Sequence, residues 1–447
     1  MKRYLKLTWL LAAVLLLTLA ACGAGETVAP EPTAATEGQL PAATLPAEVA
    51  ATLPPPVVEG EILPTPTLAA PTEGGEAVPA EQPATEAEVS GPWPADQFGY
   101  GIQIHGNATV GDPAATMQAV RDQLGLGWVK MQVQWWLVEP DPTGDQWFFY
   151  DAVIEQAHLH GLRLMVSIVG APAWTRAAGG ENGPPDDYNE YARFLGEMID
   201  RHPGRIDAIE VWNEQNLDRE WTSANGISPE DYVRFLQVAH DAIKAKDPNI
   251  IVISGALSPT GTGDWVRWAD DFEYLDRALA AGMLNYADCV GAHHNGYNIA
   301  PDVTFDAAGS TAEASTASFR GPFDNPHHSW SLKTTLDTYA QKVQAIDPNK
   351  KLCVTEFGWA SSEGYAEIPA GFEFARDNTL QEQADYIVQA FQQMNDSGNI
   401  WLAFLFNFDF GNKGSGPTDD PVPYSIIDTA GIPRPAFGAL SGMLKNP

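Results

Sequence analysis

The feature that most constrains the fold is an alternation of short apolar runs and longer amphipathic segments, which repeats eight times from residue 98 onward. Short apolar runs predict buried parallel strands, and the segments between them have the period of helices that cover a sheet. Strand then helix, eight times over, predicts an α/β fold, the (β/α)8 TIM barrel. A doubly wound open sheet gives the same local pattern with fewer repeats and stays open as the alternative. The predicted strands are residues 98–104, 128–134, 162–169, 206–212, 250–254, 289–293, 351–356 and 401–408.

The first 92 residues differ in kind from the rest. Basic residues at positions 2, 3 and 6 precede an apolar run over 7–19, which is too short to span a bilayer and is typical of a secretory signal. Residues 23–90 are rich in Pro, Ala, Thr and Glu, with eleven Glu and no Lys, Arg or aromatic residue. Such a segment buries too little apolar surface to offset chain entropy. We therefore expect a signal peptide at 1–21, a disordered linker at 22–92 and one domain at 93–447.

The signal ends in Leu19-Ala20-Ala21-Cys22, which resembles a bacterial lipoprotein box. The resemblance implies cleavage before Cys22 and lipidation of its thiol. Acyl chains there would hold the protein at the cell membrane, outside the cytoplasm, without a transmembrane helix. An ordinary signal peptide with an incidental cysteine is the alternative.

Charge and cysteine content narrow the class further. The chain has 58 acidic and 25 basic residues and a formal net charge of −33, which argues against nucleic acid as a partner. Cys289 and Cys353 each lie in an apolar run. Two buried thiols are the favoured interpretation, and a bridge between neighbouring strands stays open. The sequence has no metal-ligand pattern, and we expect no cofactor.

Polar and aromatic residues gather where the predicted strands end. In a (β/α)8 barrel the active site forms at this rim, from the strand ends and the loops that follow them. We therefore expect a pocket there. The residues at the strand ends are His105, Trp135, Trp136, Glu139, Trp174, Asn213, Glu214, Ser258, His293, His294, Glu356, Trp359, Asn407 and Asp409.

Two of these residues, Glu214 and Glu356, end the fourth and seventh predicted strands, which face one another across a barrel mouth. Hydrolysis of a glycosidic bond needs a proton donor for the departing oxygen and a second carboxylate near the anomeric carbon. The opposed pair meets that demand. A surface carboxylate or an ion-pair partner is the alternative for each residue.

Two motifs carry a specific resemblance. Val211-Trp212-Asn213-Glu214-Gln215-Asn216 and Thr355-Glu356-Phe357-Gly358-Trp359 resemble the signatures of glycoside hydrolase clan A, and the upstream residues are spaced as in families 39, 42 and 5. The resemblance covers nearly the whole domain and is closest to family 39-like and cellulase-like (family 5) enzymes that process exopolysaccharides. It implies a retaining enzyme that cleaves a β-linked polysaccharide or oligosaccharide by double displacement, with Glu214 as acid/base and Glu356 as nucleophile.

The same resemblance implies roles for other residues. Asn213 would hydrogen-bond the sugar 2-hydroxyl, Tyr297 would donate to the nucleophile, and Asn407 would contact the substrate. One of His293 and His294 would touch sugar hydroxyls or orient Glu356. Indole rings at the rim can stack on sugar faces. The candidates for this stacking are Trp135, Trp136, Trp174 and Trp359.

The sequence also departs from the clan pattern. The clan usually carries an Arg near the second strand, where this chain has Lys130. We expect Lys130 and Arg163 to partner Glu210, whose strand parity with Glu214 places a charge inside the barrel. The eighth strand lacks the usual Trp at its end, and Phe408 or Trp359 is expected to substitute.

The proposed chemistry sets conditions and leaves alternatives. Glu214 must hold a proton near neutral pH, which burial and a neighbouring carboxylate favour. A non-catalytic glycan-binding surface lipoprotein is the rival from another class, a lipid-anchored scaffold or adhesin is a third, and an inverting hydrolase is the chemical rival. The insertion at 298–330 would either close an exo pocket or flank an endo cleft. We expect a monomer whose partners are the glycan substrate and the membrane.

Overall fold

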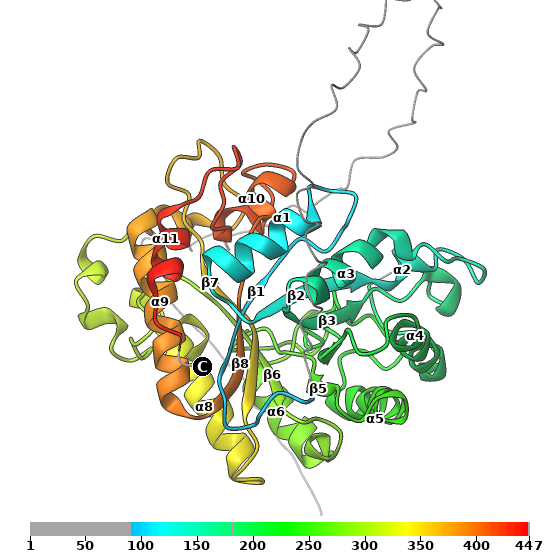
Figure 1. Ribbon diagram of the computed structural model, residues 1–447. Coiled ribbons are helices and arrows are strands. Elements are labelled where there is room, and N and C mark those ends of the chain that lie inside the picture. The colour runs from blue at the N-terminus through cyan, green and yellow to red at the C-terminus, as the bar shows by residue number, and fades with distance from the viewer. Residues whose placement is uncertain (1–90, 181, 446–447) are drawn as a thin grey trace, which may run out of the picture. The chain divides into compact units, whose positions relative to one another are not determined.

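The computed structural model describes residues 91–180 and 182–445 (Figure 1). The predicted signal peptide, Cys22 and the linker up to residue 90 lie outside this part of the chain. Eight strands occupy the middle of the described domain, with helices α3 to α5 on one side and α8, α9 and α11 on the opposite side (Figure 1). No helix in the described residues is long and apolar enough to cross a membrane.

The strands form one parallel sheet in the order β5-β4-β3-β2-β1-β8-β7-β6. Parallel bridges from Ile253 to Cys289 and from Leu257 to Ala292 join the two edge strands, β5 and β6. The ring is therefore closed, the barrel prediction is confirmed, and the open doubly wound sheet is excluded. The strands are β1 (Gly99–Gln103), β2 (Trp128–Gln134), β3 (Arg163–Val169), β4 (Ala208–Val211), β5 (Ile251–Ser254), β6 (Val290–Gly296), β7 (Leu352–Trp359) and β8 (Ile400–Leu405).

Helices cover the outside of the ring. The α5 helix shows why they begin where they do, because the Ser228 side chain accepts from the Asp231 amide and Pro229 occupies the first turn, as favoured at helix N-termini. The main helices are α1 (Pro113–Gln118), α3 (Asp151–Leu159), α4 (Tyr188–Arg201), α5 (Pro229–Lys246), α6 (Asp271–Ala280), α8 (Leu332–Gln344), α9 (Leu380–Ser397) and α11 (Pro435–Gly442), and the short ones are α2 (Trp135–Val138), α7 (Gly321–Asp324) and α10 (Phe410–Lys413).

Strand β2 shows how the sequence sorts its side chains. Successive side chains of a strand point to opposite faces. Val129, Met131 and Val133 pack in the main core under the helices, whereas Trp128 fills the barrel interior near the strand starts. Lys130 follows on the same inner face and reaches the polar centre of the barrel. The inner face therefore changes from apolar to polar toward the strand ends.

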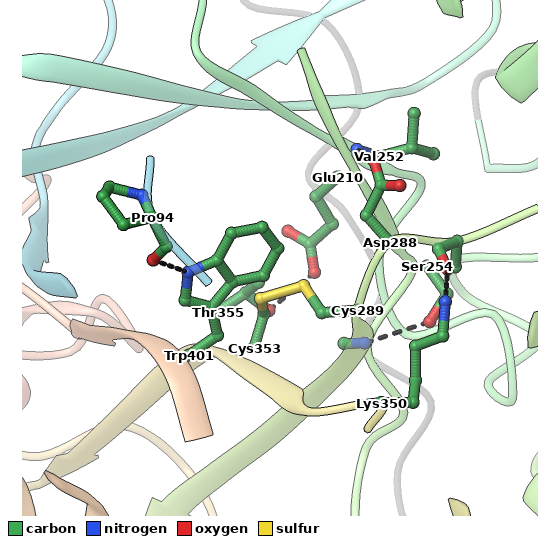
Figure 2. Close-up of a disulfide and its surroundings, with 12 residues drawn as sticks. Pro94, Glu210, Val252, Ser254, Asp288, Cys289, Lys350, Cys353, Thr355 and Trp401 are labelled. Carbon is green, nitrogen blue, oxygen red and sulfur yellow. Dashed lines mark hydrogen bonds between the residues drawn. A yellow bond between two sulfur atoms is a disulfide. The ribbon is translucent and has the colours of Figure 1, made fainter. Parts of the chain in front are cut away.

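A disulfide joins Cys289 and Cys353 in the apolar part of the barrel interior near the strand starts, beside Trp401 (Figure 2). Gly291 of β6 pairs with Cys353 of β7, and Cys289 lies two residues before Gly291, so both cysteines face the same side. Their Cα atoms are 5.8 Å apart, within the range that a disulfide spans. The favoured interpretation of two separate thiols is therefore wrong.

Residues just before β1 close the barrel at the strand starts. The Trp401 indole donates to the Pro94 carbonyl at 2.9 Å, and the Trp93 ring meets Trp128 edge-on at 5.7 Å. The Arg163 guanidinium lies 5.2 Å from the Trp93 ring and 2.8 Å from the Asp207 carboxylate. Arg163 therefore packs and pairs at the end of the barrel where the strands start. Its predicted pairing with Glu210 is wrong.

Candidate active site

A cavity of about 710 Å³ lies at the strand-end rim. Its wall is mostly polar, and its position is the one at which barrels of this kind bind ligands. Residues from six strands or the loops after them contribute to it, and they include Gln103, His105, Gln132, Gln134, Trp136, Asn213, Arg219, Glu220, Glu356 and Phe406.

Glu356 forms part of the cavity floor and is 9% exposed. The Lys130 ammonium donates to its carboxylate at 2.9 Å and to the Thr355 carbonyl at 3.1 Å. Glu356 reaches this position because β7 has an extra residue opposite β6. Ala292 pairs with Val354 and His293 pairs with Glu356, which leaves Thr355 unmatched. A bulge of this kind re-aims side chains, so both Thr355 and Glu356 face the barrel interior.

Glu214 is aimed by an unusual turn after β4. Trp212 has φ 77° and Glu214 has φ 43°, a left-handed conformation that is uncommon for residues other than glycine and is often found at functional sites. The Trp212 ring is held among Tyr191, Trp221 and Phe235, and the Glu214 amide donates to the Ala256 carbonyl at 2.9 Å. Packing around Trp212 therefore stabilises the turn that presents Glu214.

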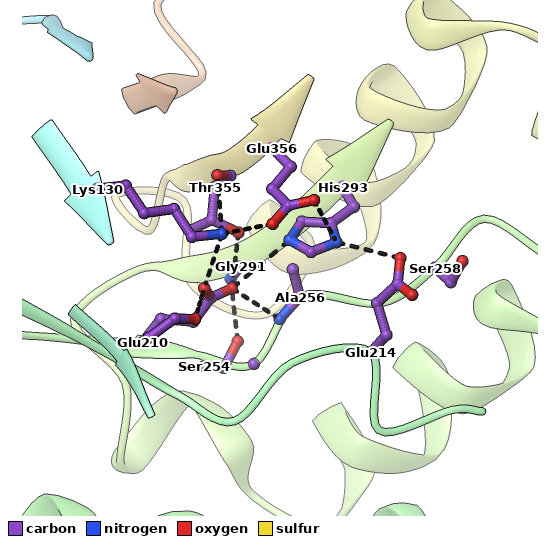
Figure 3. Close-up of polar contacts among 12 residues, drawn as sticks. Lys130, Glu210, Glu214, Ser254, Ala256, Ser258, Gly291, His293, Thr355 and Glu356 are labelled. Carbon is purple, nitrogen blue, oxygen red and sulfur yellow. Dashed lines mark hydrogen bonds and ion pairs between the residues drawn. The ribbon is translucent and has the colours of Figure 1, made fainter. Parts of the chain in front are cut away.

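His293 lies between the two candidate acids (Figure 3). Its Nδ1 is 3.2 Å from Glu214 Oε1 and 4.0 Å from Glu356 Oε2. Both carboxylates thus converge on one nitrogen, although they come from opposite strands of the barrel. The next residue, His294, points to the other face of β6 and is also buried. The structure answers the question left open by the sequence: His293 faces the site.

Glu210 lies below the acids, and its side chain is completely buried. Its carboxylate accepts hydrogen bonds from the hydroxyls of Ser167 and Thr355, and it is 3.3 Å from Lys130 Nζ and 3.8 Å from His293 Nε2 (Figure 3). The predicted partnership of Lys130 with Glu210 is confirmed. Glu210 therefore contacts two of the groups that touch the candidate acids, Lys130 and His293.

The protonation of Glu214 differs from the expectation. Burial on its own raises the pKa of the Glu214 carboxyl, but contacts with His293 and with Arg219, at 3.1 Å, lower that pKa to about 2. Burial on its own lowers the pKa of His293, but the charges of Glu356, Glu214 and Glu210 raise it above its ordinary value. The prediction of a protonated Glu214 is wrong for this geometry, because two positive partners contact it. The pair titrates as a unit, with its proton on His293.

A third carboxyl, that of Glu220, also lines the cavity. Burial and the negative charges of Glu214 and Glu356 raise the pKa of Glu220 to about 7, although Arg219 opposes the shift. Sequence reasoning missed Arg219 and Glu220, which follow the Asn-Glu motif by only a few residues. It also missed Gln132 and Gln134, whose spacing of two within an apolar strand was a signal for a polar inner face.

The predicted amide ligands have different surroundings. Asn213 lines the cavity, and no group in the described part of the chain hydrogen-bonds to its buried Oδ1. A buried acceptor without a partner fits a ligand hydroxyl. Asn407 is fully buried, donates to the Pro421 carbonyl at 2.8 Å and accepts from the Phe410 amide at 3.2 Å. Asn407 therefore shapes the loop behind the cavity wall.

Two of the four predicted stacking tryptophans, Trp135 and Trp359, are core residues. Trp135 is fully buried and stacked on Phe194, and Trp359 is 1% exposed with its indole donating to the Ile299 carbonyl. Trp174 donates to the Glu139 carbonyl at 2.9 Å. Trp136, by contrast, is 37% exposed and lines the cavity. Trp135 and Trp359 have no free face for a sugar, so their predicted stacking is wrong.

Phe408 and Tyr297 are the other aromatic residues with a predicted role. Phe406 is the aromatic side chain that β8 presents to the cavity, whereas Phe408 is buried, so neither predicted substitute for the missing Trp occupies that position. Tyr297 packs against Trp330 and Phe374. Burial and the charge of Glu214 raise the pKa of Tyr297, and the role of this phenol as a donor to Glu356 stays a prediction.

Solved structures share this barrel. The crystal structure of the GH39 enzyme from Xanthomonas axonopodis pv. citri superposes with a TM-score of 0.51 at 16% identity and covers 79% of this chain and 67% of that chain. A monomeric beta-xylosidase from Caulobacter crescentus CB15 gives 0.51 at 16%, with 79% and 68% covered. Xylanase 10B from Thermotoga maritima gives 0.52 at 14%, with 78% and 95% covered. No family model and no curated protein matches the sequence. The predicted likeness to clan A glycosidases is thus confirmed at the level of the fold.

Proposed function

We propose that the protein is a retaining glycoside hydrolase that cleaves β-linked polysaccharides or oligosaccharides, with Glu356 as nucleophile and Glu214 as acid/base. One observation carries the proposal. The carboxylates of Glu214, in the turn after β4, and of Glu356, within β7, converge on His293 within 4.0 Å, beside a polar cavity at the rim. The names of the solved structures with this fold, a xylosidase and a xylanase, support a glycoside as substrate.

The first step uses the two acids in different ways. The Glu356 carboxylate attacks the anomeric carbon and forms a glycosyl ester, while the bond to the departing oxygen breaks. That oxygen takes a proton from Glu214. In this geometry the proton is stored on His293 and reaches Glu214 through their 3.2 Å contact. The low pKa of Glu214 makes its acid form strong, and the histidine supplies the proton.

The second step reverses these roles. Water attacks the anomeric carbon, its proton passes to Glu214, and the Glu356 carboxylate leaves. An ionised Glu214 beside Arg219 and His293 suits the base role directly. Two displacements at one carbon retain the anomeric configuration.

The test is hydrolysis of a panel of 4-nitrophenyl and 2,4-dinitrophenyl β-glycosides and of β-linked polysaccharides. We expect Glu356→Gln to abolish activity. We expect Glu214→Gln to lose activity on 4-nitrophenyl glycosides but to keep much of it on 2,4-dinitrophenyl glycosides, whose leaving group needs no proton. Glu367→Gln is the matched control, because Glu367 is exposed on a loop and should behave as wild type.

Azide and the product anomer distinguish the remaining alternatives. With azide, Glu214→Ala should give a β-glycosyl azide and Glu356→Ala an α-glycosyl azide, because only the first passes through the glycosyl ester. An initial product of inverted configuration, followed by NMR, would replace the retaining mechanism with the inverting one. Binding of a polysaccharide without any cleavage by the wild type would instead favour the glycan-binding lipoprotein.

The same proposal places the enzyme outside the cytoplasm, held to the membrane by a lipid on Cys22. The residues around Cys22 and the disulfide between Cys289 and Cys353 support it, since disulfides persist in oxidising compartments. The full chain expressed in a bacterium should sediment with membranes, and Cys22→Ala should appear in the soluble fraction. Membrane association of Cys22→Ala equal to that of the wild type would contradict the anchor.

A further inference from the structure

A second cavity, of about 460 Å³, shares Arg219 with the main cavity as a lining residue. It is built by the loops after β4, β5 and β6, whereas the main cavity is built by β1, β2, β3, β4, β7, β8 and the loops after them. Arg219 lines both hollows, and its side chain is 65% exposed. The two cavities therefore adjoin along the rim, separated at this point by one exposed side chain.

Glu214, the proposed acid, contacts Arg219, the side chain that the two cavities share. Arg219 Nη2 lies 3.1 Å from Glu214 Oε2. Tyr297 lines the second cavity, and burial together with the charge of Glu214 raises the pKa of its phenol. Glu356 lines the main cavity. The sugar attacked by Glu356 thus belongs in the main cavity, and the group that takes a proton from Glu214 must leave toward the second one.

The lining of the second cavity suits sugar rings. Trp268, Trp330 and Tyr297 are half-buried aromatic residues, and such rings can cover the C–H face of a pyranose while water is displaced. Hydroxyls of Ser258 and Thr260 also line it and can exchange hydrogen bonds with sugar hydroxyls. The insertion at 298–330 contributes Trp330 to this wall, so it flanks the cavity that adjoins the site.

We propose that the second cavity binds the sugar residues on the leaving-group side of the scissile bond, so that the enzyme cleaves within a glycan chain rather than at its end. The inference rests on the proposed function and adds the mode of action to it. A chain that crosses from the main cavity past Arg219 into the second cavity occupies both sides of the bond.

The first test needs no variant. Wild-type protein is incubated with β-1,4-xylan, β-1,4-mannan and mixed-linkage β-glucan, and the molar mass of the polymer is followed with the release of small sugars. We expect the mean molar mass to fall steeply while monosaccharide and disaccharide are scarce. Release of one small sugar from a polymer whose mass barely changes would overturn the inference and leave the hydrolase proposal standing.

The second test compares substrates that differ only beyond the cleaved bond. For each protein, kcat/KM on a pentasaccharide of the cleaved polymer is divided by kcat/KM on a 4-nitrophenyl glycoside, which leaves the second cavity largely empty. Trp268→Ala should lower this ratio about tenfold, the effect of losing roughly 1.4 kcal/mol of stacking. Trp268→Phe should restore most of it. Phe148→Ala, at an exposed ring elsewhere on the surface, should keep the wild-type ratio.

The outcomes separate the two proposals. An unchanged ratio in Trp268→Ala and in Trp330→Ala would overturn the assignment of the second cavity. Failure of the wild type to cleave both polymers and aryl glycosides would overturn the hydrolase proposal itself.

Discussion

Lys130 Nζ lies 3.3 Å from Glu210 Oε2, and both side chains are completely buried inside the barrel. The same ammonium is 2.9 Å from Glu356. Burial on its own lowers the pKa of Lys130, but the two carboxylates raise it above its ordinary value. Burial likewise favours a neutral Glu210, yet Lys130, His293 and two hydroxyls lower the pKa of that carboxyl. One buried cation therefore pairs with two buried carboxylates, and Glu210 holds it next to Glu356, the proposed nucleophile.

Replacement of Lys130 by methionine is expected to reduce activity more than substrate affinity. The change keeps the length of the side chain and removes the donor to Glu356, so we expect kcat to fall about 100-fold or more, as when a preorganised donor is lost, with a small change in KM. Glu210 would also lose its cation, and the free energy of unfolding should fall by roughly 3 kcal/mol. Steady-state kinetics and urea unfolding measure the two effects.

The control for this prediction is the double variant Lys130→Met/Glu210→Gln. It removes the unpaired charge together with the cation, so stability should recover relative to Lys130→Met while activity stays low. Near-normal kcat in Lys130→Met would show that the ammonium does not position Glu356, the proposed nucleophile.

Arg219 is expected to set the alkaline limit of activity. Its positive charge lowers the pKa of Glu214, so Arg219→Gln should bind the shared proton more tightly. The reaction needs that proton, and the alkaline limb of kcat/KM should therefore move to higher pH. Because Arg219 is exposed, added salt should move the wild-type limb in the same direction. Arg320→Gln, at another surface ion pair, is the control, and identical limbs in wild type and Arg219→Gln would refute the assignment.

The sequence predicts the barrel, and the position of Glu214 and Glu356 near its rim, because both depend on local pattern. Eight apolar runs define the strands, and the two Glu residues directly follow the apolar residues of the fourth and seventh runs. The positions of the other site residues depend on irregular backbone. The unmatched Thr355 in β7 turns Glu356 inward, and the left-handed Trp212 aims Glu214 at His293. Neither feature can be predicted from the alternation of side chains along a regular strand.

The tryptophans show a second limit. Trp135 and Trp136 are neighbours in sequence, yet the first stacks on Phe194 in the core and the second lines the cavity. The two rings differ in position because the short helix α2 turns them to different sides. The helix α4 covers the ring of Trp135. The same holds for His293 and His294, which differ only in the face of β6 from which they project.

The disulfide is expected to raise the free energy of unfolding without changing the activity. Cys289 and Cys353 are 64 residues apart in sequence, and closure of a loop of that size in the unfolded chain corresponds to about 4 kcal/mol. The Cys289→Ala/Cys353→Ala variant should unfold at a lower urea concentration, while kcat on aryl glycosides stays near that of the wild type. Because the bridge is buried, thiol reagents should reduce it only after unfolding. Equal unfolding midpoints for the two proteins would contradict a stabilising role.

His294 is expected to make the fold sensitive to acid. Burial lowers the pKa of His294 to about 4 in the folded protein, against about 6.5 in the unfolded chain. The unfolded state therefore binds more protons between these values, so the free energy of unfolding rises with pH through this window and is lost on acidification. The full difference is about 3 kcal/mol. The nearby Asp271 has a lowered pKa, so its own contribution is lost only at lower pH. Unfolding of wild type and His294→Gln in urea at pH 4.0, 5.5 and 7.0 tests this: the stability of the variant relative to wild type should improve steadily as the pH falls. A constant difference across the three pH values would show that His294 is not the group responsible.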